Sequence, residues 1–223
     1  MDDAKTMASA GAQRPPGEAD ADRVRTNILE IATEEFAAKG LTGARIDEIA
    51  ERTLTSKRMI YYHFGGKEGL YRAVLAHCYG RIRTIESTLD LGGRPPLEAL
   101  AHLVRFTFDY QVANEDFIRL VMVENIHRAE YVSQMPELQA LNLKVIELLR
   151  GICERGAAEG VIRPDVDPTD LHMSISALCF FNVANRHTFS VIHEVDMMSI
   201  AAKTARRETI VEMVLRYVRP AAA

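Results

Sequence analysis

Cysteine is scarce in this chain of 223 residues, which contains Cys78, Cys153 and Cys179 and no Cys-x-x-Cys pair. An odd number of isolated cysteines argues against a disulfide framework. Each one stands in a helical pattern, where cysteine usually acts as a small packing residue. The sequence therefore predicts a protein of the reducing cytoplasm.

Long apolar runs are absent as well. No stretch approaches the roughly 18 apolar residues that a membrane-spanning helix needs, although 48% of the residues are hydrophobic. That content, interleaved with charges, is typical of a soluble globular protein with a sizeable core. Residues 1–20 have mixed charge and no apolar segment, so they are predicted to form a disordered tail rather than a signal peptide.

Motifs of the common enzyme classes are missing. The chain has no Gly-x-Ser-x-Gly elbow, no phosphate-binding loop and no Gly-x-Gly-x-x-Gly after a strand. A carboxylate-bridged metal bundle needs two Glu-x-x-His motifs, and this chain has one, from Glu124 to His127. The sequence predicts a protein that is not an enzyme and holds no cofactor or metal. A metal-binding bundle stays open as an alternative.

Apolar residues recur instead with helical spacing, and no segment alternates as a strand would. The predicted fold is all-α, with three N-terminal helices followed by a larger helical body. The predicted helices span residues 22–39, 46–52, 56–64, 67–89, 97–112, 115–128, 136–159, 168–184 and 204–218. Ser56, Asn114 and Asp167 are the predicted N-caps of three of them. Residues 185–203 fit either a loop or a short helix.

The net charge of −4 is unevenly distributed. Residues 53–83 contain six Lys or Arg residues and one acid, Glu68, which gives this segment +5 and leaves −9 on the rest of the chain. A solvated face would mix the two signs. A basic segment on an acidic chain is typical of a protein that docks one end on a polyanion.

Overlapping the start of the basic segment, IDEIAERTLTSKRMIYYHFGGK (residues 46–67) predicts two short helices joined by a tight connection. Ile46 and Ile49 are expected to pack against Phe36, so that the first helix braces the second. Ile60 and Phe64, spaced i, i+4, are expected to anchor the second helix. This is the pattern of a helix-turn-helix, whose second helix enters the major groove of DNA.

Polar and aromatic side chains in and around the second helix form the predicted DNA-binding set: Arg45, Thr55, Ser56, Lys57, Arg58, Tyr61, Tyr62, His63 and Lys67. Arg45, Lys57 and Arg58 are predicted to reach base edges, because arginine pairs with guanine through two hydrogen bonds. Three others are predicted to position the protein on phosphates: Tyr61, His63 and Lys67.

Gly40-Leu41 followed by IDEIAERTLTSKRMIYYHFGGKEGL resembles the DNA-binding domain of the TetR family of transcriptional regulators. The resemblance covers about residues 22–75. The resemblance implies a homodimer that acts as a repressor rather than an activator. Such a protein binds a palindromic operator in double-stranded DNA and releases it when a small effector enters the C-terminal domain. The implied division is a tail at 1–20, a DNA-binding domain at 21–66 and an effector-binding and dimerisation domain at 67–220.

Three places depart from the family pattern. Thr53-Leu54-Thr55 fills a turn where a small residue or glycine followed by valine is common, and Ala44-Arg45 precedes a helix that Ser or Thr usually caps. Arg58 stands where a small residue is usual. It is expected to add a base or phosphate contact, so the operator preference should differ from that of relatives.

Polar residues within apolar helices of the body predict an effector pocket, because buried polar groups must pair with each other or with a ligand. The predicted set is Phe106, Tyr110, Asn125, Phe181, Asn182 and Arg186. Arg186 beside His187 suits an organic acid. The alternative is an internal salt bridge between Arg186 and Glu124.

Apolar stripes on the last two helices predict a dimer interface in the form of a four-helix bundle. The stripes consist of Leu171, Ile175, Leu178, Ile210, Val211, Val214, Leu215 and Val218. The remaining alternative is a helical adaptor that binds protein through its basic end. Salt dependence separates the two, because counterion release makes DNA binding steeply salt-sensitive.

Overall fold

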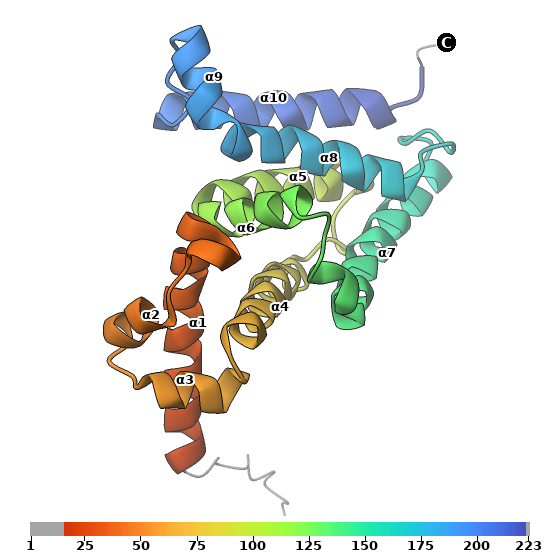
Figure 1. Cartoon of the computed structure of the whole chain (residues 1–223). Coiled ribbons are helices and arrows are strands. Elements are labelled where there is room, and N and C mark those ends of the chain that lie inside the picture. The colour runs from red at the N-terminus through yellow and green to blue at the C-terminus, as the bar shows by residue number, and fades with distance from the viewer. Residues whose placement is uncertain (1–15, 222–223) are drawn as a thin grey trace, which may run out of the picture.

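The computed structural model describes residues 16–221, and the side chains of residues 20–221. This part of the chain forms ten α-helices and one 3₁₀ turn, without a strand (Figure 1). The N-terminal helices are α1 (Pro16–Gly43), α2 (Ile46–Arg52) and α3 (Lys57–Phe64). The body consists of α4 (Lys67–Glu86), α5 (Pro96–Ala113), α6 (Glu115–Ile126), η1 (Val132–Gln134), α7 (Pro136–Ala158), α8 (Pro168–Ala184), α9 (Arg186–His193) and α10 (Ile200–Val218). The predicted all-α fold is confirmed.

Several helix boundaries agree with the prediction. The bounds predicted for α2 and α8 match the structure, and residues 185–203 contain α9 and the start of α10. At the N-terminus, α1 begins at Pro16 rather than Asp22, so residues 16–20 of the predicted tail are helical, while 1–15 lie outside the described residues. Gly40 interrupts α1 with φ 66° and ψ 176°, a conformation that glycine adopts without steric cost.

Two of the three predicted N-caps are present. The Ser56 hydroxyl accepts a hydrogen bond from the Met59 N–H at 3.2 Å, and the Asp167 carboxylate accepts one from the Asp170 N–H at 2.8 Å. The Asn114 prediction was wrong. Asn114 alone separates α5 from α6, and its amide donates to the Tyr110 carbonyl at 2.7 Å, so it satisfies the end of α5 instead.

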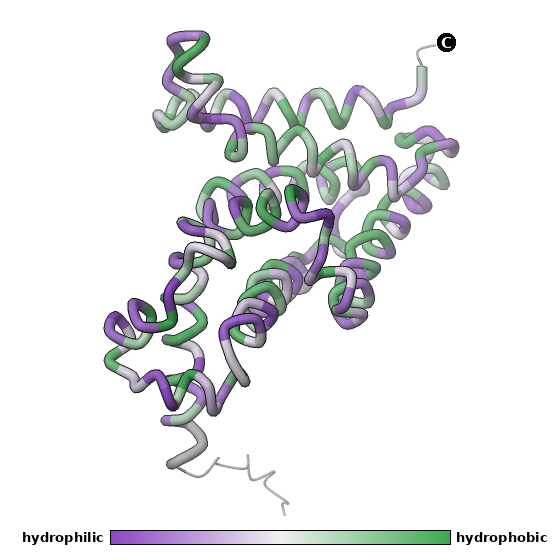
Figure 2. Tube along the Cα trace, viewed as in Figure 1, coloured by the Kyte–Doolittle hydropathy of each residue, from purple (hydrophilic) through white to green (hydrophobic). Residues whose placement is uncertain are grey.

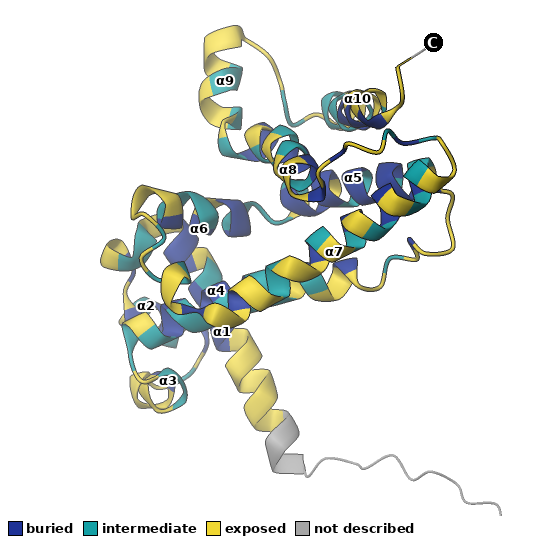
Figure 3. Ribbon diagram, turned by 90° about the vertical axis from the view of Figure 1, so that its right-hand side faces the viewer, coloured by how far each residue is buried: buried dark blue, intermediate teal, exposed yellow. Residues whose placement is uncertain are grey.

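The N-terminal helices share one hydrophobic core with the adjoining part of the body. Phe36, Ile49 and Ile60 are fully buried and belong to the same cluster as Tyr71 of α4 and Ile118 of α6. Figure 3 shows that α1 projects beyond this core, and residues 20–27 of this helix are exposed. The two predicted domains are therefore joined through α4 and α6 rather than by a free linker.

A second core occupies the rest of the body, where α10 and α8 pack on α5 (Figure 1). Hydrophobic and hydrophilic residues alternate around these helices (Figure 2), so each has one face for the core and one for the surface. None of the described helices is long and apolar enough to cross a membrane.

The residues predicted for the dimer interface belong to this second core. Six of them are buried and two are partly buried within the same chain: Leu171, Ile175, Ile210, Val211, Val214 and Val218, and then Leu178 and Leu215. The prediction was wrong for the six buried side chains, because helical periodicity identifies a buried face without showing what covers it. An interface on α8 and α10 must use their opposite faces.

Candidate DNA interface and effector sites

Helix α3 is held as a short rigid element between two capping residues. Ser56 caps its N-terminus, and Gly65 follows its C-terminus at φ 74°, with its N–H donating to the Tyr61 carbonyl at 2.8 Å. A positive φ at this place favours glycine. On the inner face, Ile60 is fully buried and Phe64 is partly buried in the N-terminal core. The opposite face of α3 is therefore fixed in orientation and open to solvent.

The open face of α3 carries four of the predicted DNA-binding residues. Tyr62 is 79% exposed and Tyr61 is 49% exposed, which excludes both from the core. The Lys57 ammonium lies 2.6 Å from the Asp47 carboxylate. Arg58 is exposed and has no hydrogen bond or ion pair among the described residues. Its guanidinium is thus available for a partner outside the chain.

Four predicted residues flank this face or support it. The Lys67 ammonium donates to the Thr42 carbonyl at 3.1 Å, and the Arg45 guanidinium lies 3.7 Å from Glu48. Thr55 is half-buried and donates to a backbone carbonyl within the turn. His63 is half-buried, with its ring 5.3 Å from that of Tyr62. Each of these cations keeps N–H donors that the contacts do not use, so each can still bind a phosphate.

Sequence reasoning missed Arg25 of α1. Its guanidinium lies 5.4 Å from the centre of the Phe64 ring, which places a positive charge beside the end of α3. The basic segment of residues 53–83 also differs from the expected single patch. Arg72 donates to Gln134, and Arg83 pairs with buried Glu86, so these charges follow α4 away from α3.

The two departures from the family pattern on either side of α2, Ala44-Arg45 and Thr53-Leu54-Thr55, each have a visible effect on the structure. Leu54, in the turn, adopts φ 53° and is 96% exposed, so a strained leucine occupies a left-handed position. The start of α2 has no side-chain cap from Arg45. Instead, the carboxylate of buried Glu35 accepts the Arg45 N–H at 3.1 Å. This contact resembles that of the glutamate in a capping box, which also accepts the N–H of the N-cap residue. It does not replace Ser or Thr, whose side chain would accept an N–H inside the first turn of α2.

The six residues predicted to bind an effector do not line one cavity. Tyr110, with its ring 5.8 Å from Phe106, borders a cavity between α1, α4 and the α5–α6 corner. Phe181 and Asn182 border another cavity of about 450 Å³ between α8, α9 and the chain leading into α10. Asn125 is exposed and donates to the carbonyl one turn before it. Its inclusion in a pocket was wrong.

The polar residues of α6 and α9 also have partners that were not predicted. Buried Glu124 accepts hydrogen bonds from the Tyr71 hydroxyl at 3.0 Å and from the Val132 N–H at 3.1 Å. Arg186 pairs with Glu115, 71 positions earlier. The salt bridge between Glu124 and Arg186 is therefore absent. The predicted binding of an organic acid relied on a free Arg186, and this arginine is already paired with Glu115.

Another buried polar group in the body was missed. Glu86 is buried beside Arg83, whose Nε atom is enclosed without a hydrogen-bond partner. Burial, with a smaller effect of Arg83, lowers the pKa of His172 to about 4. The side-chain oxygen of Gln111 and the side-chain nitrogen of Asn182 are also enclosed without partners. The i, i+3 spacing of Arg83 and Glu86 was the available signal for the first pair.

A capped, exposed recognition helix braced by α2 and joined to a helical body defines a helix-turn-helix transcriptional regulator. The family model described as bacterial regulatory proteins, tetR family, matches residues 28–74, and the Tetracyclin repressor-like C-terminal domain matches residues 96–214. The chain belongs to the TetR family of transcriptional regulators. These proteins regulate transcription and are not enzymes.

Two curated relatives extend this likeness over most of the chain. HTH-type transcriptional repressor NicS of Pseudomonas putida is 38% identical over 199 residues, which cover 89% of this chain and 94% of the relative. HTH-type transcriptional repressor KstR2 of Rhodococcus jostii is 29% identical over 147 residues, which cover 64% of this chain and 70% of the relative.

Solved structures show the same architecture. The transcriptional regulator SCO4942 of Streptomyces coelicolor has a TM-score of 0.67 and 29% identity, with 88% of this chain and 99% of that one covered. FadR of Bacillus subtilis, solved in complex with stearoyl-CoA, has a TM-score of 0.65 over 87% of this chain and 99% of that one. At 18% identity, this second match shows the shared fold alone.

Proposed function

We propose that this protein is a repressor that binds a palindromic operator as a homodimer in the cytoplasm and releases it when a small effector binds. The observation that carries the proposal is the exposed face of α3, with Lys57, Arg58, Tyr61 and Tyr62 held outward by the buried Ile60. Cationic and aromatic side chains on a rigid helix suit phosphates and base edges. The curated relative NicS is itself named a repressor.

The proposed dimer uses the outward faces of α8 and α10. Met173 and Phe181 are exposed on α8, and Met213 and Tyr217 are exposed on α10. The Tyr217 hydroxyl lies 3.5 Å from the Asp170 carboxylate, which brings the start of α8 beside the end of α10 and aligns the two exposed faces. A second copy that covers these apolar side chains gives a two-fold interface.

Release of DNA by a small molecule is proposed from the fold family. FadR, which shares the fold, was solved with stearoyl-CoA. An effector that binds one arrangement of body and recognition helix better than another shifts the protein toward that arrangement. No cofactor or metal is part of this proposal.

Selection of bound sequences from random double-stranded DNA tests the operator. A palindromic motif is expected, with half-sites about one helical turn apart or a multiple of it. Arg58→Ala is expected to weaken binding to the selected site by about 1–3 kcal/mol if Arg58 reads a base, and to relax the preference at that position. Arg150→Ala, at an exposed position of α7, is the matched control and should leave binding unchanged.

Salt dependence separates this proposal from a protein-binding adaptor. The affinity for the selected DNA is expected to fall steeply with added salt, because each neutralised phosphate releases counterions. Absence of any enriched sequence, together with binding that salt does not affect, would favour the adaptor.

A further inference from the structure

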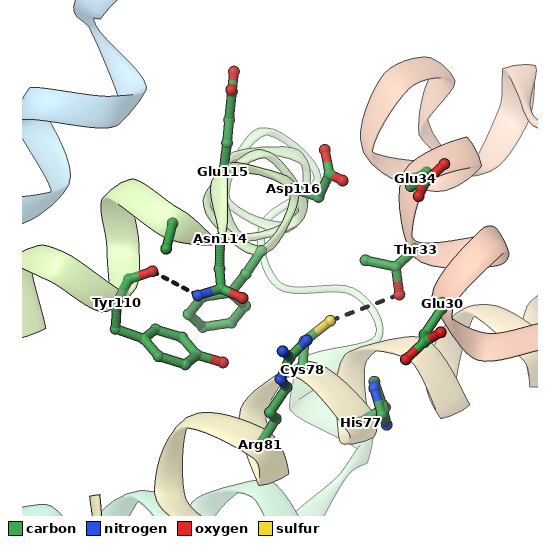
Figure 4. Close-up of a pocket in the computed structure, with 12 residues that line it drawn as sticks. Glu30, Thr33, Glu34, His77, Cys78, Arg81, Tyr110, Asn114, Glu115 and Asp116 are labelled. Carbon is green, nitrogen blue, oxygen red and sulfur yellow. Dashed lines mark hydrogen bonds between the residues drawn. The ribbon is translucent and has the colours of Figure 1, made fainter. Parts of the chain in front are cut away.

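A cavity of about 430 Å³ lies where α1, α4 and the corner between α5 and α6 meet (Figure 4). Cavities of this size suit small ligands. Its α1 wall belongs to the DNA-binding domain, and the α5–α6 corner belongs to the body. A molecule in this cavity therefore touches both parts of the protein.

The acidic side of the cavity contains carboxylates with and without partners. Glu34 pairs with Arg52, and Glu115 pairs with Arg186 and points away from the cavity in Figure 4. Glu30 and Asp116 have no hydrogen bond or ion pair among the described residues. Burial, followed by the nearby Glu34 carboxylate, raises the pKa of Asp116. A cation placed here would relieve that like-charge contact.

The opposite side offers one positive charge and the hydroxyl of a largely buried tyrosine. Arg81 has no ion pair among the described residues. Tyr110 is only 7% exposed, and its hydroxyl, which has no hydrogen-bond partner in the described chain, points toward Arg81 across the cavity (Figure 4). Buried polar groups are normally paired. A carboxylate can accept hydrogen bonds from the guanidinium and from this hydroxyl together.

We propose that the cavity binds a small zwitterion of the amino-acid class, with its carboxylate on Arg81 and the Tyr110 hydroxyl and its ammonium on Glu30 and Asp116. A simple anion would leave both of these carboxylates unpaired. A simple amine would leave the guanidinium and the hydroxyl unpaired. His77 supplies no competing charge near neutral pH, because burial and Arg81 lower its pKa.

Such a ligand is positioned to act as the effector, and this step rests on the function proposed above. It bridges α1 and the start of α6, so it favours one position of the DNA-binding domain relative to the body. By linkage, the factor by which it changes DNA affinity equals the factor by which DNA changes ligand affinity.

Thermal unfolding of the full chain, without DNA, tests the site. The common L-amino acids are compared with butyrate and ethylamine, which carry only one of the two charges, at equal ionic strength. At least one amino acid is expected to raise Tm, and the single-charge probes are expected to leave it unchanged. Failure of every amino acid to raise Tm overturns the proposal. A rise produced by butyrate or ethylamine alone overturns the chemical class.

Two variants locate the ligand that raises Tm. Arg81→Gln is expected to abolish the shift, while Arg150→Gln, at an exposed position of α7, is expected to retain it. Tyr110→Phe is expected to weaken binding about tenfold, which corresponds to one hydrogen bond to a charged group. A shift that persists in Arg81→Gln overturns the site.

Fluorescence polarisation with the selected operator then tests coupling. The amino acid that raises Tm is expected to change DNA affinity in the wild type but not in Arg81→Gln. If no operator is selected, the proposed function fails while the Tm result still decides the site. If DNA binds and no amino acid raises Tm, only this inference fails.

Discussion

At the scale of single residues, Leu54 shows a local conflict between sequence and backbone. Its φ of 53° belongs to the left-handed region, and its side chain is almost fully exposed, so no packing offsets the strain. Leu54→Gly is expected to raise the free energy of unfolding by about 1 kcal/mol, because glycine adopts this conformation without a steric penalty. Urea denaturation measures the change.

Leu54→Ala is the control for this prediction. Alanine retains Cβ and therefore the strain, so its free energy of unfolding should stay close to that of the wild type. A glycine variant less stable than the alanine variant would show that the turn is not strained.

His172 predicts a pH dependence of stability. Its folded pKa of about 4 lies below the ordinary value of 6.5, so the unfolded chain takes up a proton first as pH falls. Stability is therefore lost as pH falls from about 6.5 toward 4. Between about pH 7 and pH 5 the loss is on the order of 1–2 kcal/mol after allowance for solvent screening.

His172→Gln is expected to remove this part of the pH dependence. Arg83 and Glu86 remain in both proteins, so their contributions largely cancel in the difference. His127→Gln, at an exposed position, should behave as the wild type does. Equal slopes of unfolding free energy against pH for His172→Gln and wild type would contradict the prediction.

At the scale of helices, α2 depends on a carboxylate from another helix. Glu35 accepts the Arg45 N–H and also lies 3.0 Å from the Lys39 ammonium. Glu35→Ala is expected to lower the free energy of unfolding by about 1–2 kcal/mol, since it removes the acceptor of the Arg45 N–H and leaves that group unpaired. Glu35→Gln keeps a hydrogen-bond acceptor and should lose less. Equal stability of Glu35→Ala and wild type in urea denaturation would show that this hydrogen bond does not stabilise the start of α2.

N-caps could be predicted from the sequence where the capping hydrogen bond joins residues close together in the chain. Ser56 and Asp167 cap α3 and α8 through residues three positions away, and such contacts are readable from spacing. Glu35 and Arg45 lie ten positions apart on different helices, and no local pattern predicts their contact. Asn114 failed as a cap because two helix ends compete for one side chain.

The candidate sites differ in predictability for the same reason. The exposed face of α3 comes from one short segment, so residue type and helical spacing were sufficient to propose Arg58 and Tyr62. The cavity beside Tyr110 is assembled from α1, α4 and α6, which only the tertiary fold brings together. The partner of Arg186 could not be predicted because Glu115 lies 71 positions away and competes with Glu124 on the same helix.

At the scale of the whole molecule, the DNA-binding helices pack directly on the helices of the body. Tyr71 of α4 packs on Phe36 of α1, with ring centres 5.1 Å apart, and donates to Glu124 of α6. Close-packed cores respond to a shift by moving whole elements rather than by deforming locally. Movement of α6 is therefore expected to displace α4 and, through it, the recognition helix.

Binding to a palindromic operator also requires the proposed dimer, because one recognition helix contacts only one half-site. Met213→Asp places a charge in the proposed apolar interface, at a side chain 46% exposed in the monomer, so the fold should survive. The variant is expected to be monomeric by light scattering at micromolar concentration. It should bind the operator at least about a hundredfold more weakly, because the avidity of two linked half-sites is lost. Leu143→Asp, on the exposed side of α7, should remain dimeric and retain full affinity. A dimeric Met213→Asp that binds DNA normally would place the two-fold axis on another face of the protein.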